Sequence, residues 1–200
     1  MNKIKVVALF GKSGAGKDTI LQHILERYKS QVKGIVSCTT RPKRDYEVDG
    51  VDYHYLTTEE FTVKVLNYEM LEATEFNGWF YGTSIDELDA NKVNVGVFNP
   101  TGVEALVKDG RLEVLPIEVY ADDKVRLLRA LNREVHPNCK EICRRFFADE
   151  EDFADLEDIG SFSTVYNNID NGLHWTVITA IETLIEDFMH SGSYGGITSN

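Results

Sequence analysis

The chain has 200 residues, enough for one compact domain or for a core with small insertions, and it needs no disulfides for stability. Its 33 acidic and 21 basic residues give a net charge of −12, which argues against a general binder of nucleic acid polymers or of anionic membranes. No stretch approaches the roughly 20 apolar residues of a membrane span. Three cysteines without a secretory signature predict a reduced, cytoplasmic protein.

The first segment, residues 4–28, predicts a buried strand, a glycine-rich turn and an amphipathic helix. The turn, residues 11–19, reads GKSGAGKDT, close to the P-loop pattern GxxxxGK[ST]. Its glycines let successive N–H groups point into one hollow, where they meet phosphate oxygens at the positive end of the helix, and Lys17 adds a full positive charge. So short a motif also arises by chance, and the flanking strand and helix are what support a phosphate site.

The motif departs from its pattern at one position. Asp18 stands where a Ser or Thr hydroxyl normally ligates Mg²⁺, and Thr19 follows it. A carboxylate beside a phosphate is repelled unless a cation lies between them, so Asp18 must either ligate the metal, directly or through water, or turn away. We expect Asp18 to be the metal ligand.

Further elements alternate between strand and helix. Strands are expected at 34–37, 53–56, 70–76, 78–83, 93–99, 117–120 (with Pro116 at its start) and 163–166. A capping box at Thr57 and Glu60 predicts a helix that begins after Thr57, and a second at Ser84 and Glu87 predicts a helix from there to about residue 91. Thr101 with Glu104 predicts a third helix. Asp122 is expected to cap a helix at 123–131, and another begins at 140. A last helix is expected to bury Trp175, Ile178, Ile181, Ile185 and Phe188.

This alternation predicts an α/β fold, a P-loop kinase three-layer sandwich with a parallel central sheet covered on both faces. Residues 37–83 read as a small β-rich insertion in that core, and the Ser- and Gly-rich residues 191–200 as a flexible tail. Ligands are expected at the carboxyl ends of the strands.

Basic residues gather in two places despite the acidic composition. Residues 38–44 carry three cations, and Pro42 favours an exposed loop that is suited to an anion, although a solvated basic turn would look the same. Arg126, Arg129 and Arg133 lie three and four residues apart and so share a helix face. The last two could equally be solvated charges or salt-bridge partners.

The block 37–53, SCTTRPKRDYEVDGVDY, closely resembles guanylate kinases, and the likeness extends over most of the chain. It includes the P-loop, Glu72, the YGT sequence at 81–83, the arginine helix and residues 165–168. The resemblance implies purine nucleotide metabolism: ATP and GMP or dGMP as partners, ADP and GDP or dGDP as products, and Mg²⁺ as cofactor. It also implies three parts: a P-loop core at 1–36, 84–124 and 150–190, a mobile GMP-binding domain at 37–83, and a lid at 125–149.

The resemblance carries site residues with it. The matched ATP-binding residues are Ser13, Gly14, Ala15, Gly16, Lys17, Asp18, Thr19 and, near the adenine, Asn167. The matched GMP-binding residues are Ser37, Arg41, Arg44, Tyr53 and Tyr81 for the phosphate and Glu72 and Thr83 for the guanine. Physical chemistry agrees, because Arg offers forked donors to phosphate and a carboxylate accepts both guanine N1 and N2 protons.

Two positions where the family usually carries acidic residues hold Val97 and Asn99. If Asn99 lies at the base, its amide can serve guanine through its oxygen or adenine after a flip. We therefore expect GMP and dGMP to be the best acceptors, with measurable leakage to other bases.

Phosphoryl transfer needs alignment and positive charge rather than a general base. The residues expected to supply them are Lys17, Arg41, Arg44 and the lid arginines Arg129, Arg133 and Arg145. Alternatives are a kinase for another nucleoside monophosphate and a non-catalytic guanylate-kinase-like binding module. We expect the protein to be a monomer or a homodimer. A zinc site at His136, Cys139 and Cys143 is also conceivable, but we interpret the helical cysteines as small apolar fillers.

Overall fold

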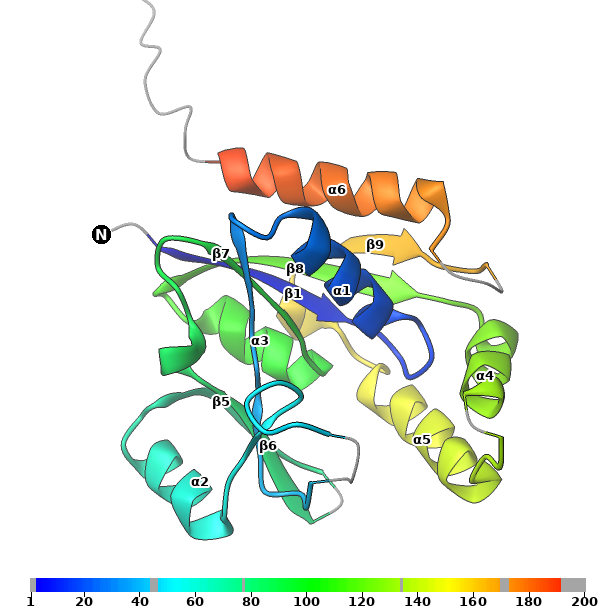
Figure 1. The fold of residues 1–200 in the computed structure, drawn as a ribbon, viewed down its shortest axis with the longest axis horizontal. Helices are drawn as coiled ribbons and strands as arrows, with labels where there is room; N and C mark the ends of the chain where they lie inside the picture. Colours follow the sequence, from blue (N-terminus) through cyan, green and yellow to red (C-terminus); the bar gives the residue numbers. More distant parts are fainter. Residues whose placement is uncertain (1–2, 44–46, 77, 134, 170–172, 192–200) are drawn as a thin grey trace, which may run out of the picture.

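The computed structural model describes residues 3–43, 47–76, 78–133, 135–169 and 173–191 (Figure 1). Five parallel strands form the main sheet in the order β2-β7-β1-β8-β9. Their bounds are β1 (Ile4–Phe10), β2 (Val32–Gly34), β7 (Val93–Val97), β8 (Leu112–Tyr120) and β9 (Ser163–Tyr166).

Helices cover both faces of this sheet. On one face, α1 (Lys17–Arg27) and α6 (Trp175–His190) bury Ile24 and Ile181 against Leu9 of β1. On the other face, α3 (Pro100–Lys108) packs Leu106 against Phe10, the next residue of that strand. Successive side chains of a strand point to opposite faces, so one apolar run supplies both core layers. The predicted three-layer sandwich with a parallel central sheet is confirmed.

A second, four-stranded sheet lies below the main one in Figure 1, in the order β4-β3-β6-β5. Its elements are β3 (Cys38–Thr39), β4 (His54–Tyr55), β5 (Met70–Phe76), β6 (Trp79–Ser84) and the covering helix α2 (Thr58–Leu66). Phe61 of α2 stacks on Phe80 with ring centroids 5.6 Å apart. Two further helices, α4 (Asp123–Asn132) and α5 (Cys139–Asp152), stand together beside the carboxyl ends of the main strands (Figure 1).

Local signals placed many elements well. The capping box at Thr57 and Glu60 is formed in both directions. The hairpin of β5 and β6 is antiparallel, with Gly78 at a positive φ of 75°, while Asn77 lies outside the described residues. The predicted strand at 163–166 is β9.

Other expectations were wrong, each for a tertiary reason. Residues 34–37 do not form one strand, because Ile35 continues β2 along β7 and the chain then crosses to the small sheet as β3. The helix expected after Ser84 is a single 3₁₀ turn (Ile85–Glu87). The Ser84 hydroxyl donates to the Glu69 carbonyl instead of capping, and Glu87 pairs with His54 at 2.7 Å.

The remaining corrections concern strand and helix ends. Asn99, not Thr101, caps α3, and its Oδ1 accepts from Gly102 N at 2.8 Å. Asp122 stands at the start of α4 but makes no side-chain cap bond. Pro116 lies in the middle of β8, where β9 pairs only from Ile117 onward.

The terminal helix is only partly as expected. Ile181, Ile185 and Phe188 are buried, but Trp175 is 68% exposed, and Val177 takes the core position near that end. The predicted tail falls largely on residues 192–200, outside the described part. Among the described residues, no helix has the length and apolar character needed to cross a bilayer.

Candidate functional site

The glycine-rich turn joins β1 to α1 and presses against the rest of the core. Gly14 and Gly16 have φ of 81° and 99°, which L side chains rarely adopt. A Cβ at Gly14 would lie 2.6 Å from the Arg126 carbonyl oxygen, and one at Gly16 would lie 2.5 Å from Asn167 Nδ2. Both glycines are therefore required for conformation and for space.

Lys17 begins α1 and folds back over this turn. Its Nζ donates to the Gly11 carbonyl at 2.6 Å and to the Lys12 carbonyl at 3.3 Å. Burial lowers the pKa of the Lys17 ammonium, and the neighbouring Asp18 carboxylate works against that shift. The ammonium group is thus held inside the turn with little water around it, and a bound phosphate would stabilise its charge.

A cavity of about 280 Å³ lies between the two sheets. It is lined by Ser13 and Lys17 from the turn, by Ser37, Glu72, Thr74 and Tyr81 from the small sheet and the chain leading into it, by residues 97–99, and by Asp149, Asp152 and Phe153 from the α5 end. The predicted phosphate turn and the predicted base-reading carboxylate therefore open onto one space.

Glu72 is held opposite Thr83 in the β5–β6 ladder. Burial raises the pKa of Glu72 to about 7, and hydrogen bonds from the hydroxyl and backbone of Thr83 moderate the rise. Thr83 is fully buried and its hydroxyl lies 3.2 Å from Ser37 Oγ. These three side chains form one continuous polar edge of the cavity.

Asn99 lies beside Glu72 at the start of α3. A Cβ built on Gly102 would lie 3.0 Å from Asn99 Oδ1 and 3.6 Å from Glu72 Oε2. In the ligand-free chain Oδ1 accepts the Gly102 N–H, so an amide flip would bring two donors face to face and lose this helix cap. The Nδ2 donor and the second lone pair of Oδ1 remain for a ligand.

The basic loop places Arg41 at a second cavity of about 290 Å³, lined also by Ser13, Glu47, Tyr53, Tyr81, Arg145, residues 148–149 and Asp152. Arg41 pairs with both oxygens of Glu47, at 3.0 and 2.8 Å, and lies over the Tyr53 ring. This pairing raises the Arg41 pKa above its usual range. Arg44, expected at the same phosphate, lies outside the described residues.

Glu47 is one of the acidic residues that the sequence interpretation missed at this cavity, with Asp149 and Asp152. It is 7% exposed and also accepts from the Tyr55 hydroxyl at 2.8 Å. The sequence signal was an acidic residue six positions after Arg41, just beyond the basic residues of the loop. Its carboxylate holds the guanidinium in a fixed orientation.

The three arginines of α4 differ from one another. Arg126 is 1% exposed, Arg129 is half-buried, and Arg133, at the C-cap of the helix, is exposed, so the shared face runs from the core to solvent. Arg129 donates to four backbone carbonyls, those of Gly14, Ala15, Asn167 and Ile169, at 2.6–3.1 Å. It therefore braces the turn against the end of β9. Arg133 and Arg145 line a cavity of about 410 Å³ with Ser13 and Gly14, and Arg145 pairs with Glu141.

Asn167 lies against Gly16 of the turn and is 2% exposed. Its Nδ2 donates to the Ala15 carbonyl at 2.8 Å, while Oδ1 has no partner among the described residues. It lines a cavity of about 610 Å³ together with Gly16, Thr19 and Arg129.

Asp18 is exposed on the first turn of α1. Its negative charge works against the lowering of the Lys17 pKa by burial and adds to the raising of the Tyr53 pKa. In the described ranges, no three His, Cys, Asp or Glu side chains are grouped as a metal site, and this includes the proposed zinc ligands. Cys139 and Cys143 are exposed, so their interpretation as apolar fillers was wrong.

Comparison with known proteins identifies the family. The family model of guanylate kinases matches residues 3–182. A guanylate kinase of Schizosaccharomyces pombe is 44% identical over 91 residues, covering 44% of this chain and 45% of that protein. One from Synechococcus elongatus is 36% identical over 144 residues, 70% of each chain. The chain spans about half the length of most of the curated relatives it matches.

A solved structure supports the fold. The guanylate kinase from Anaplasma phagocytophilum superimposes with a TM-score of 0.67 over 96% of this chain and 90% of that one, at 20% sequence identity. At this identity the likeness concerns the fold.

We predict that Glu72→Gln stabilises the ligand-free protein at high pH. The pKa of Glu72 is 4.5 in the unfolded chain and about 7 in the folded protein, so the folded state binds the proton more tightly. The free energy of unfolding of the wild type therefore falls as the pH rises from about 4.5 to about 7. The loss reaches about 3 kcal/mol above pH 7, and glutamine avoids it. Denaturant unfolding at pH 5 and pH 8 should show a gain only at pH 8. Glu75→Gln, on the exposed side of β5, is the control, and equal responses of the two variants would contradict this account.

Proposed function

Because the chain belongs to the guanylate kinase family, we propose that it transfers the γ-phosphoryl group of ATP to GMP or dGMP, giving ADP and GDP or dGDP. The observation that carries the proposal is that Lys17 of the glycine-rich turn and Glu72 of the small sheet line the same cavity. A phosphate-binding element and a purine-reading carboxylate in one cavity are the minimum that a nucleoside monophosphate kinase requires.

The donor nucleotide fits the turn and the large cavity beside it. Lys17 and the backbone N–H groups of residues 13–19 would hold the phosphates. The unpartnered Oδ1 of Asn167 offers a buried acceptor to a donor group such as an adenine amino group. Arg133 and Arg145 face the turn from α4 and α5 and would bring positive charge to the transferring group.

The acceptor nucleotide fits across the other two cavities. Its phosphate would meet Arg41, with Tyr53 and Tyr81 as uncharged donors and Arg44 from the same loop. Its base would meet Glu72 and Thr83. Guanine presents adjacent N1 and N2 donors to the carboxylate, whereas adenine presents an acceptor at N1, which leaves a buried group unpaired at a cost of about 1–3 kcal/mol. Asn99 is neutral and already caps α3 through Oδ1, so we assign most of the discrimination to Glu72.

The residues around Asp18 suit Mg²⁺. This ion prefers oxygen ligands and is commonly held by one or two carboxylates together with substrate phosphates and water. Asp18 is exposed and accepts no hydrogen bond from any described residue, and the Thr19 hydroxyl adjoins the donor cavity. When bound, the ion neutralises charge that develops on the phosphates.

The chemistry follows from placement rather than from a general base. Lys17 and the turn fix the donor phosphates, and Arg41 and Arg44 hold the acceptor phosphate in line. Arg133 and Arg145 approach the phosphates as the lid closes and excludes water. Residues 37–83 and 125–149 are the parts we propose to move against the core, because two anionic substrates must enter before they are enclosed. We also propose that the protein works in a reducing compartment such as the cytoplasm, and its free cysteines support this proposal.

A kinase for another nucleoside monophosphate and a non-catalytic binding module are the alternatives. Product formation with a panel of GMP, dGMP, AMP, UMP, CMP and TMP separates them. We expect GMP and dGMP to lead, AMP to follow by one to two orders of magnitude, and Lys17→Ala to lose at least about 100-fold in turnover. Lys108→Ala, an exposed lysine of α3, is the control. A pyrimidine as best acceptor would refute the guanine assignment, and no transfer to any nucleotide would favour the binding module.

Asp18→Ser should weaken Mg²⁺ binding and so raise the Mg²⁺ concentration that turnover requires, because it removes the one carboxylate assigned to the ion. We expect the half-saturating Mg²⁺ concentration to rise about tenfold at fixed ATP, with the fold unchanged because Asp18 is exposed. The control is Glu26→Ser, at an exposed position later in α1. An unchanged or lower Mg²⁺ requirement in Asp18→Ser would show that this carboxylate is not a ligand.

A further inference from the structure

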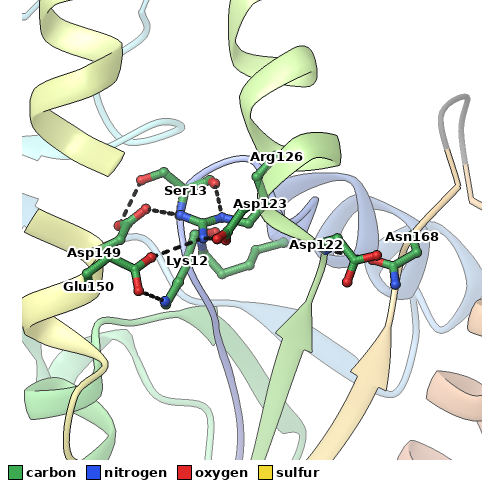
Figure 2. A network of polar contacts seen from close by, with 9 residues as sticks. Lys12, Ser13, Asp122, Asp123, Arg126, Asp149, Glu150 and Asn168 are labelled. Atoms are coloured by element: carbon green, nitrogen blue, oxygen red, sulfur yellow. Dashed lines mark hydrogen bonds and ion pairs between the residues drawn. The ribbon is translucent and has the colours of Figure 1, made fainter. Parts of the chain in front are cut away.

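A carboxylate from α5 is bound to the glycine-rich turn, as Figure 2 shows. Asp149 Oδ2 accepts from the Ser13 backbone N–H at 2.8 Å and from Arg126 Nη2 at 2.8 Å. Its other oxygen, Oδ1, accepts from the Ser13 hydroxyl at 3.1 Å. One anionic oxygen thus receives a backbone donor of the turn and a guanidinium donor of α4 at the same time.

The position of this oxygen matters for the reaction. Asp149 and Ser13 both line the Glu72 cavity and the Arg41 cavity. Lys17 borders the first of these and Arg145 the second. The carboxylate therefore stands among cations at the place where, in the proposed reaction, the donor and acceptor phosphates would meet.

Arg126 is held in place by groups other than Asp149. Its Nε donates to the Ser13 carbonyl at 3.0 Å, its Nη1 donates to Asp123 at 2.8 Å, and its guanidinium lies 4.7 Å from the centre of the Phe146 ring. Although only 1% exposed, Arg126 lines the cavity of about 410 Å³ between α4, α5 and the turn. If Asp149 withdrew, Nη2 and the Ser13 N–H would still converge on one point, an arrangement suited to a phosphate oxygen.

We propose that Arg126 is a further phosphate-binding residue of this enzyme, and that Asp149 is an internal anion that occupies the same oxygen position until a triphosphate displaces it. The inference rests on the proposed function, because it assigns the turn to a nucleotide. A triphosphate and the carboxylate repel each other and compete for the same two donors, so they exclude one another. Displacement releases the end of α5 from the turn, which couples phosphate binding to movement of the helix that carries Arg145.

The neighbouring residue provides a matched control. Glu150 also joins α5 to the turn, through an ion pair with Lys12 at 2.6 Å, and it lies 3.6 Å from Arg126 Nη1. It is 46% exposed and has no hydrogen bond to Ser13 or to Arg126 Nη2, the two donors that Asp149 Oδ2 occupies. A variant at Glu150 loosens the same helix without freeing the oxygen position. Asp149→Asn frees it, because an amide retains the shape but carries no charge to compete with phosphate.

The test is calorimetric titration of the wild-type protein, Asp149→Asn and Glu150→Gln with inorganic tripolyphosphate and with ATP. We expect Asp149→Asn to bind tripolyphosphate about tenfold more tightly than wild type, and Glu150→Gln to stay within about twofold. Unchanged or weaker binding by Asp149→Asn overturns the proposal, as does an equal gain in Glu150→Gln. Tripolyphosphate has no base, so this result stands apart from GMP phosphorylation; if the kinase assay fails while tripolyphosphate behaves as expected, only the proposed function falls.

Two further variants complete the design. Arg126→Lys in the Asp149→Asn background retains the charge but not the forked donors, and it should weaken tripolyphosphate binding about tenfold relative to Asp149→Asn alone. Equal affinity of the two variants would show that Arg126 does not bind the phosphate.

If Asp149→Asn does not fold, Ser13→Ala replaces it, since it removes only the hydroxyl bond to Asp149. It should bind tripolyphosphate about twofold to threefold more tightly, and no gain overturns the proposal.

Discussion

The backbone of the glycine-rich turn touches three other parts of the chain with no space for a side chain, and the rest of the site depends on this close approach. Gly11 lies against the Val119 carbonyl of β8, Gly14 against α4, and Gly16 against Asn167 after β9. The turn is therefore packed as part of the core. The directions of its N–H groups follow from the positions of the sheet and of α4 as much as from its own sequence.

Carboxylates near the site hold arginines in place in a chain that carries a net charge of −12. Glu47 pairs with Arg41, Glu141 with Arg145, and Asp149 with Arg126. A buried or half-buried guanidinium without a partner is costly, so these pairs keep the cations ordered in the absence of substrate.

Glu72 shows a conflict between stability and recognition. The same burial that raises its pKa to about 7 also removes water from the hydrogen bonds it would make to a base. A neutral residue would suit the empty fold better, and perturbed carboxyl groups of this kind are typical of binding sites. The neighbouring Thr83 hydroxyl and N–H moderate the conflict without removing it.

The sequence by itself determined the elements whose signals are local. The strand, turn and helix of residues 4–27, the capping box at Thr57 and the hairpin of β5 and β6 depend on side-chain periodicity, glycine conformation and caps within a few residues. The candidate residues came from the same turn and from family resemblance. The tertiary structure decided which groups these residues bind, because a side chain forms hydrogen bonds with the groups that the fold places within reach. Ser13 and Asp149 are 136 positions apart, and Ser84 bonds Glu69 rather than capping a helix. No local pattern encodes such contacts, so the burial of Arg126, the bracing role of Arg129 and the exposure of Trp175 became visible only in the folded chain.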